Sequence, residues 1–297
     1  MQKVLVIVGP TAIGKSGFGI KLAQKYNGEI ISGDSVQVYR GFDIGSGKIT
    51  PEEAKGIKHY LIDTKDFNED YNVAEFQKEA RRLIEDIASR DKLAIIVGGT
   101  GLYIKATLYD YVFNEEDIED DDFKELSNEE IYAKLKELDP ECLEKIHVNN
   151  RKRLVRALNV CLKTNEKMSD NIKAQSHKML YDAKIIGLTT NREEVYARID
   201  KRVRMMIDDG LENEIRTLLN KGVKFSDKPM TSIGYKQFEE YINGNQDLER
   251  TIELIQRDTR RFAKRQYTWF NHQTPIEWYD IHHLEEAIVA IDRWLHE

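Results

Sequence analysis

Apolar residues recur along this chain with two different spacings, and the two spacings alternate. Short β-branched runs have the length and composition of buried strands, and they lie at residues 3–8, 28–33, 59–63, 92–97 and 183–188. Between and after these runs, apolar positions recur at helical spacing, over residues 15–26, 73–88, 193–206, about 247–270 and 284–295. Strands that alternate with helices predict an α/β fold in which helices flank a parallel sheet.

One long segment breaks this alternation. Between residues 97 and 183 no strand pattern appears, while Ile131, Leu135 and Leu138 form a helical stripe. Seven of the eight residues at 115–122 are acidic, which is typical of a solvated linker. We therefore expect a small all-α insertion domain at 113–180, within a core formed by residues 1–112 and 181–297.

Composition places the chain among ordinary globular proteins. Its 297 residues are 40% hydrophobic and 33% charged, and the formal net charge is −7. Any contact with nucleic acid must therefore come from local basic faces. Cys142 and Cys161 have neither metal-ligand spacing nor the density of a disulfide scaffold, so we expect small buried or half-buried side chains in a reducing cytosol. No signal peptide or membrane-length apolar run is visible, which predicts a cytoplasmic protein without membrane contact.

The first strand leads into a phosphate-binding motif. Residues 9–16, Gly-Pro-Thr-Ala-Ile-Gly-Lys-Ser, fit G-x-x-x-x-G-K-[ST] between a strand and a helix. Backbone N–H groups of such a loop surround an anion, and the helix start adds partial positive charge. Lys15 would reach the terminal phosphate, and the Ser16 hydroxyl would ligate Mg²⁺. The pattern predicts a P-loop NTPase-like core that binds a phosphorylated ligand, with a chance match as the alternative.

Two more candidate residues follow predicted strands, where ligands bind in open α/β sheets. Asp34 could act as a base, cap the next turn or lie beside Mg²⁺. Thr100, after Gly98 and Gly99, offers a hydroxyl for a ligand or for the helix N-terminus. No Walker-B aspartate follows this strand, which disfavours a nucleotide hydrolase.

Cations gather at two places. Residues 151–156 contain four cations beside an apolar stripe, and the last long helix combines Arg261, Lys264 and Arg265 with aromatic residues. Cations interleaved with aromatics suit an RNA backbone and unstacked bases. The alternative is a solvated helix whose aromatics pack in the core, as we expect for at least Trp269 and Phe270.

The segment at 41–56 contains four glycines, which predicts a mobile polar loop. Lys48 within it either approaches phosphate or nucleic acid, or is a solvated loop lysine.

Motifs that run in order from residue 9 to about 270 resemble the tRNA dimethylallyltransferase family, also called tRNA isopentenyltransferases. The Asp-Ser-x-Gln and Gly-Gly-Thr-Gly-Leu-Tyr motifs are the most specific, because a phosphate loop is shared with many kinases. The matching motifs are Gly9-Pro10-Thr11-Ala12-x-Gly14-Lys15-Ser16, Asp34-Ser35-x-Gln37-x-Tyr39, Asp43-Ile44-Gly45, Gly98-Gly99-Thr100-Gly101-Leu102-Tyr103, Arg153-Leu154-x-Arg156-Ala157-Leu158, Arg198-Ile199-x-x-Arg202, Ile233-Gly234-Tyr235-Lys236 and Arg260-Arg261-Phe262-Ala263-Lys264-Arg265-Gln266-x-Thr268-Trp269.

The resemblance implies transfer of a dimethylallyl group from dimethylallyl diphosphate to N6 of adenosine 37 in tRNAs that read codons beginning with U. Asp34 would accept the N6 proton, Thr100 would hold the bridging oxygen of the leaving diphosphate, and Mg²⁺ would bind at Ser16. The diphosphate-binding residues would be Gly9, Thr11, Ala12, Ile13, Gly14, Lys15, Ser16 and Arg202. The tRNA-binding residues would be Ser35, Gln37, Tyr39, Lys48, Arg153, Arg156, Arg261, Lys264 and Arg265.

The resemblance also implies the bacterial form, since no zinc-finger extension follows the last helix, and an insertion that contacts the anticodon stem-loop. Separately, we expect a monomer. Departures are modest: Ile13 stands where many members have Ser, and Ser46-Gly47 where many have Thr-Ala. Two rival interpretations remain. One is a P-loop kinase for a nucleoside or metabolite, with Asp34 as base and ATP as donor. The other is a non-enzymatic RNA-binding protein with a vestigial nucleotide loop.

Overall fold

A parallel sheet forms the centre of the computed structural model, which describes residues 1–113, 123–174 and 177–297. Its strand order is β3-β2-β4-β1-β5-β6, and all neighbouring strands in it are parallel. This confirms the predicted α/β core with a parallel sheet. The strands are β1 (Lys3–Val8), β2 (Gly28–Gly33), β3 (His59–Tyr60), β4 (Leu93–Gly98), β5 (Asp182–Thr189) and β6 (Glu277–Asp280).

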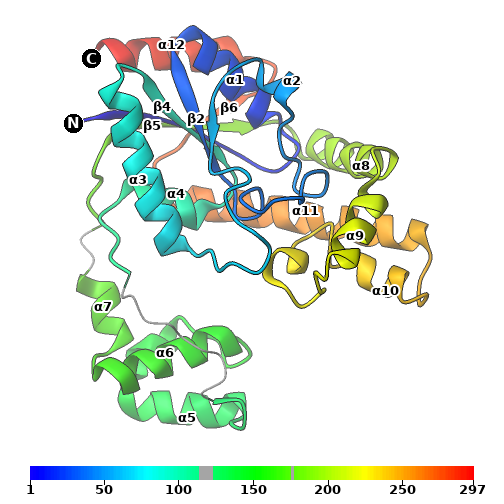
Figure 1. Cartoon of the computed structure of the whole chain (residues 1–297). Coiled ribbons are helices and arrows are strands. Elements are labelled where there is room, and N and C mark those ends of the chain that lie inside the picture. Colours follow the sequence, from blue (N-terminus) through cyan, green and yellow to red (C-terminus); the bar gives the residue numbers. More distant parts are fainter. Residues whose placement is uncertain (114–122, 175–176) are drawn as a thin grey trace. The chain divides into compact units, whose positions relative to one another are not determined.

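Helices cover both faces of the sheet (Figure 1). Gly19 of α1 packs against Val97, whereas Ile104 of α4 and the adjacent strand residue Ile96 both lie beside Gly33. Because successive strand residues point to opposite faces, α1 and α4 cover opposite sides. The helices of this unit are α1 (Lys15–Lys25), α2 (Pro51–Ala54), α3 (Val73–Ser89), α4 (Gly101–Leu108), α8 (Arg192–Asp208), α9 (Leu211–Asn220), α10 (Phe238–Ile242), α11 (Leu248–Gln273) and α12 (Leu284–His296).

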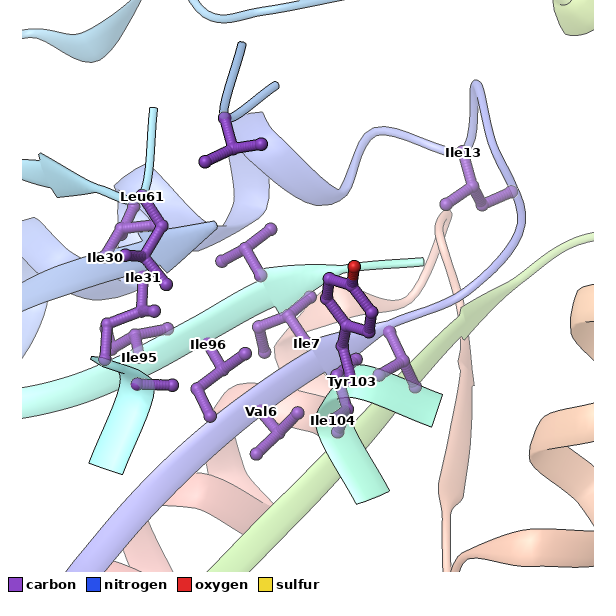
Figure 2. Close-up of a cluster of buried hydrophobic side chains, with 14 of the residues drawn as sticks. Val6, Ile7, Ile13, Ile30, Ile31, Leu61, Ile95, Ile96, Tyr103 and Ile104 are labelled. Carbon is purple, nitrogen blue, oxygen red and sulfur yellow. The ribbon is translucent and has the colours of Figure 1, made fainter. Parts of the chain in front are cut away.

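The central strands are buried on both faces, as β-branched runs in a parallel sheet should be. All five residues from Val4 to Val8 are 0% exposed. A fully buried Val or Ile side chain stabilises the fold by about 1.5–3 kcal/mol, so this core fixes the strand ends from which the functional loops start. Figure 2 shows part of the cluster, with Val6, Ile7, Ile30, Ile31, Ile95, Ile96, Tyr103 and Ile104 labelled.

The insertion forms a second compact unit. Residues 110–178 separate from a unit made of 1–109 and 179–297, whereas the sequence predicted 113–180. Its described helices are α5 (Asn128–Leu138), a 3₁₀ helix η2 (Pro140–Glu144), α6 (Arg151–Thr164) and α7 (Met168–Ala174). They enclose a core of their own, in which Cys142 and Cys161 are buried as predicted. Burial raises the pKa of the Cys142 thiol to about 12. The predicted acidic linker at 115–122 lies outside the described residues.

Three local expectations need correction. The 41–56 segment, predicted as loop throughout, contains α2, whose capping box joins Thr50 and Glu53; Pro51 is a further helix-start signal in the sequence. The predicted strand at 59–63 shrinks to β3, because Leu61 and Asp63 adopt positive φ. β6 was not predicted, and it pairs with β5 at the edge of the sheet. In the described parts of the chain, no helix is both long and apolar enough to span a membrane.

Candidate active site

The loops that follow β1, β2 and β4 meet at one edge of the sheet and border a cavity of about 310 Å³. Helix α8, helix α11 and the segment around Ile233 form its other walls. Several of the predicted site residues line this cavity, although they come from five separate stretches of sequence. They are Thr11, Ala12, Asp34, Ser35, Thr100, Arg202 and Arg265. This is the position expected for a ligand in an open parallel sheet.

The phosphate loop has the backbone conformation that an anion site needs. Gly14 takes the left-handed conformation, with φ 97°, immediately before α1 begins at Lys15. The Lys15 ammonium donates to the Pro10 carbonyl oxygen at 2.7 Å, so it lies over its own loop. Burial lowers the pKa of Lys15 to about 7; the neighbouring Arg202 adds to this shift and Asp34 opposes it. The site therefore holds positive charge at an energetic cost, which an anion would relieve.

Arg202 on α8 supplies the second cation. Burial lowers the pKa of its guanidinium, while the charges of Asp34 and Glu53 raise it. The guanidinium packs on Gly47, where an added Cβ would lie 1.7 Å from an Arg202 nitrogen. Glycine at 47 therefore gives Arg202 the room to reach this position. Within the described residues, neither Lys15 nor Arg202 forms an ion pair with a carboxylate.

Asp34 and Thr100 differ in whether their side chains bond to the local backbone. Asp34 Oδ1 accepts from the N–H groups of Val36 at 2.8 Å and Gln37 at 3.3 Å. Asp34 thus caps the turn, and these two bonds orient its carboxylate. The other carboxylate oxygen of Asp34 carries no hydrogen bond within the described chain. Thr100 occupies the N-cap of α4 but makes no side-chain capping bond. The residue Thr100 itself lines the cavity. Because its side chain makes no capping bond, the helix-capping alternative for Thr100 is wrong.

Comparison with known proteins identifies the family. The family model described as IPP transferase matches residues 37–273. A tRNA dimethylallyltransferase from Macrococcus caseolyticus is 48% identical over 297 residues, covering 97% of this chain and 95% of its own. The chain belongs to the tRNA dimethylallyltransferase family.

Solved structures agree with this family membership. A tRNA delta(2)-isopentenylpyrophosphate transferase from Staphylococcus epidermidis is 40% identical with a TM-score of 0.74, and the match covers 99% of both chains. A eukaryotic dimethylallyltransferase acting on tRNA is 31% identical with a TM-score of 0.84, and the match covers 94% of this chain and 74% of that one.

Three residues for which the resemblance to this family implied tRNA contacts are directed into the protein. Tyr39 is 1% exposed, and its hydroxyl has no hydrogen-bond partner within the described chain. The Lys48 side chain is 5% exposed and pairs with Asp43 at 2.6 Å and Asp63 at 2.5 Å. The interpretation of Lys48 as a solvated lysine is wrong, and the structure does not support RNA contacts by Tyr39 or Lys48.

Gln37, the third of these residues, is partly buried and joins β2 to the loop at Ser46 and Gly47. Its Nε2 donates to the carbonyl oxygens of Ser46 at 3.3 Å and Gly47 at 3.2 Å. Its Oε1 accepts from the Ser32 hydroxyl at 2.9 Å. Gln37 therefore ties β2, which directly precedes Asp34, to the loop on which Arg202 packs.

Sequence reasoning missed Glu214, which fixes the same loop. Its carboxylate accepts from the N–H groups of Asp43 at 3.1 Å, Ile44 at 2.6 Å and Gly45 at 3.2 Å. The Tyr235 hydroxyl donates to it at 2.7 Å, and the Tyr235 ring fills the space beside Gly45. The Asp-Ile-Gly and Ile-Gly-Tyr motifs mark both contact partners, but nothing in the sequence around Glu214 indicates its role.

The basic residues predicted to bind tRNA divide between the two units. In α11, Arg261, Lys264 and Arg265 are exposed, whereas Phe270 is buried and Trp269 packs partly against the core. In α6, Arg153 and Arg156 are exposed. Arg151 of the same cluster is not free, because its guanidinium donates to the carbonyl oxygens of Phe123 and Leu126. The exposed cations are available to an RNA backbone.

Whether Mg²⁺ could bind at Ser16 depends on the ligand atoms that the residues around it offer. Ser16 is exposed at the start of α1 and also borders a small cavity of about 20 Å³, whose lining is half polar, with Ser32, Gln37 and His59, and half Ile and Val side chains. No group of three acidic, His or Cys side chains that could hold a metal occurs in the described residues. Mg²⁺ typically keeps several waters and binds through substrate phosphates with few protein ligands. A serine hydroxyl beside a phosphate loop fits this mode.

Proposed function

We propose that the protein transfers the dimethylallyl group of dimethylallyl diphosphate to N6 of adenosine 37 in tRNAs that read codons beginning with U, and releases diphosphate. The observation that carries this proposal is that Asp34, Thr100 and Arg202 border the same cavity as the phosphate-loop residues Thr11 and Ala12. A base, a hydroxyl, a cation and an anion-binding loop are what alkyl transfer from a diphosphate requires. Family membership supports the same reaction class.

The reaction replaces one bond at carbon 1 of the allyl group with another. Adenine N6 attacks this carbon while the carbon–oxygen bond to the diphosphate breaks, and the electron pair leaves with the bridging oxygen. Asp34 accepts the proton that N6 loses, and the Thr100 hydroxyl donates to the bridging oxygen. An exocyclic amine is a poor nucleophile, so alignment and a positioned base must supply much of the acceleration.

The departing diphosphate gains charge as the bond breaks. Lys15, Arg202 and the N–H groups of the phosphate loop neutralise it from fixed positions, without reorganisation during the reaction. Ser16 would hold Mg²⁺, which when bound would supply further charge neutralisation at the diphosphate oxygens. The absence of an acidic residue directly after β4, where Gly99 and Thr100 lie, also fits, since no terminal phosphoryl group is transferred.

The acceptor base must leave the anticodon loop to reach this cavity. Extruding a stacked base costs a few kcal/mol, and contacts between the RNA backbone and exposed cations offset that cost. Arg265 lines the cavity, and Arg261 and Lys264 lie on the same helix. Arg153 and Arg156 of the insertion would bind the anticodon stem-loop. The monomeric state and the cytoplasmic location that the sequence predicts stay predictions.

The direct test uses unmodified tRNA with an A36-A37-A38 anticodon loop, Mg²⁺ and radiolabelled dimethylallyl diphosphate. We expect label to enter the RNA, and to be lost when A37 is replaced by G. No incorporation, together with ATP-dependent phosphorylation of a small acceptor, would establish the rival kinase function. RNA binding without either reaction would support the non-enzymatic alternative.

A further inference from the structure

Gln266 on α11 lies between two loops that border the cavity. Its Oε1 accepts from the Thr11 N–H at 3.0 Å, and its Nε2 donates to the Gly99 carbonyl oxygen at 3.1 Å. The side chain is buried, at 5% exposed. Thr11 belongs to the phosphate loop, and Gly99 directly precedes Thr100. One amide therefore joins the loop that would bind the diphosphate to the loop that would contact its bridging oxygen.

The two hydrogen bonds fix which way the amide points, because a backbone N–H can only donate and a carbonyl can only accept. Glutamine satisfies both groups at once. Glutamate has the same shape, but an ionised carboxylate would direct a lone pair at the Gly99 carbonyl oxygen. Leucine has a similar volume and would leave two buried backbone groups without partners. The position thus selects an amide by its hydrogen-bond chemistry.

The two glycines that flank Thr100 in the sequence, Gly99 and Gly101, pack tightly against side chains of α11. A Cβ added at Gly99 would lie 2.2 Å from Gln266 Nε2, and one added at Gly101 would lie 2.1 Å from the Trp269 ring. Gln266 and Trp269 are three residues apart, so they share a face of α11. This face holds the backbone immediately before and after Thr100, whose hydroxyl is not fixed by its own helix.

We propose that Gln266 is a positioning residue for alkyl transfer, which sets the spacing between the diphosphate loop at Thr11 and the hydroxyl of Thr100. This inference rests on the proposed function. Gln266 acts through Thr11 and Gly99 and has no place in the lining of the cavity. A misplacement of about 1 Å at a reacting centre can cost about 10²-fold in rate, so the spacing matters more for turnover than for ground-state binding.

The same helix also carries exposed cations, which under the proposed function would meet RNA. Phe262 and Arg265 line the cavity, and Arg265 directly precedes Gln266. One rigid helix thus holds the donor-side loops and contributes to the wall that the acceptor base would meet. Through α11, Gln266 thereby fixes the position of the diphosphate-binding loops relative to the acceptor base.

The test compares Gln266→Glu and Gln266→Leu with Thr251→Ala as a matched control. Thr251 is fully buried on the same helix, and its hydroxyl donates to Asp247 and accepts from Gln246, away from the cavity. Label transfer at saturating substrates, expressed per folded protein, gives kcat. KM for dimethylallyl diphosphate and Kd for tRNA are measured in parallel.

We expect both Gln266 variants to lose about 10–10²-fold in kcat, with Kd for tRNA unchanged and KM changed less than kcat. Thr251→Ala should lower the melting temperature and keep kcat. If the wild-type protein transfers label and Gln266→Glu matches its kcat, or if Thr251→Ala loses as much, the positioning role is refuted while the proposed function stands. If the wild-type protein transfers no label, the proposed function and this inference both fail.

Discussion

Strand β2 runs between two charged clusters that are built in opposite ways. At its start, Glu29 is 4% exposed and fully partnered. Its carboxylate accepts from Arg90 at 2.7 and 2.8 Å, from Lys92 at 2.7 Å and from Tyr60 at 2.7 Å. Hydrogen bonds from Arg90, followed by those from Lys92 and Tyr60, hold the pKa of Glu29 far below its usual range despite burial.

The cluster beyond the other end of β2 lacks such pairing. Lys15, Arg202 and Asp34 influence one another electrostatically, but no ion pair joins them in the part of the chain that the structure describes. Burial lowers the pKa of both cations. Removing one partner from a buried cluster of this kind destabilises the fold, whereas unpartnered cations beside a cavity cost stability until an anion binds. The difference separates a structural cluster from a binding site.

The largest effect should come from Asp34→Asn. Asparagine keeps an oxygen for the Val36 and Gln37 N–H groups, so the turn should persist, but it cannot accept the N6 proton. We expect kcat for label transfer to fall by about 10²–10⁴-fold, with little change in Kd for tRNA by filter binding. A comparable loss of RNA affinity would remove Asp34 from the role of base.

Glu29→Ala should show the converse behaviour. Removing one member of a buried ion cluster costs about 3 kcal/mol, the low end of the usual range, because Arg90 and Lys92 remain about a third exposed. Urea unfolding measures this loss, and kcat per folded protein should not change. The exposed Glu52→Ala should shift stability by less than about 0.5 kcal/mol. Equal stability of Glu29→Ala and wild type would contradict the structural role.

Arg202→Met tests the unpaired cluster directly. A hydrogen bond to a charged group contributes about 1.5–3 kcal/mol, so the affinity for dimethylallyl diphosphate should fall by about 10–10²-fold in calorimetry. The unfolding free energy should stay equal or rise, since no ion pair is lost. Arg198→Met on the same helix, where Arg198 pairs with Glu194, should leave the affinity intact. Matching losses in both variants would argue against a special role for Arg202.

The exposed cations of α11 belong to neither cluster, and replacing one of them should have the smallest effect of these changes. Arg265→Glu should weaken tRNA binding and reduce the slope of log K against log salt by about 1. The control is Arg250→Glu, near the other end of the helix, where Arg250 pairs with Glu253. A salt slope equal to that of the wild type would exclude Arg265 from the RNA interface.

Local patterns were enough to predict most strands of the sheet, the phosphate loop and the main helices, although the edge strand β6 was missed. Each depends on residues close in sequence: alternation, helical spacing, or a motif between a strand and a helix. The site residues that follow strands could also be placed, because the carboxyl ends of parallel strands share one edge. Thr11, Asp34 and Thr100 meet at the cavity for this reason.

Side-chain direction within loops was less predictable. Lys48 pairs with Asp63, 15 residues away; Glu214 binds Asp43, 171 residues away; and Gln266 bonds Thr11, 255 residues away. Such contacts depend on how separate elements pack, which neither spacing nor local propensity encodes. Tyr39 sits in the Asp-Ser-x-Gln-x-Tyr motif and Lys48 in the glycine-containing segment, but the fold turns both side chains inward.

The central claim is that the site keeps its cations unpaired for an anionic ligand, and proton uptake at Lys15 tests it most directly. Dimethylallyl diphosphate, without tRNA, is titrated into the protein at pH 8 in two buffers of different ionisation enthalpy. With a pKa of about 7 in the free protein, Lys15 is mostly neutral at pH 8. It should gain nearly one proton as the diphosphate raises that pKa, and affinity should decline as pH rises above 7.

At pH 6 the uptake should be small, because Lys15 is already protonated, and in Lys15→Met it should vanish at saturating ligand. Uptake near one proton at pH 8 in the wild type, absent in Lys15→Met, is the predicted result. Binding with no uptake, or with equal uptake in both proteins, would contradict the account.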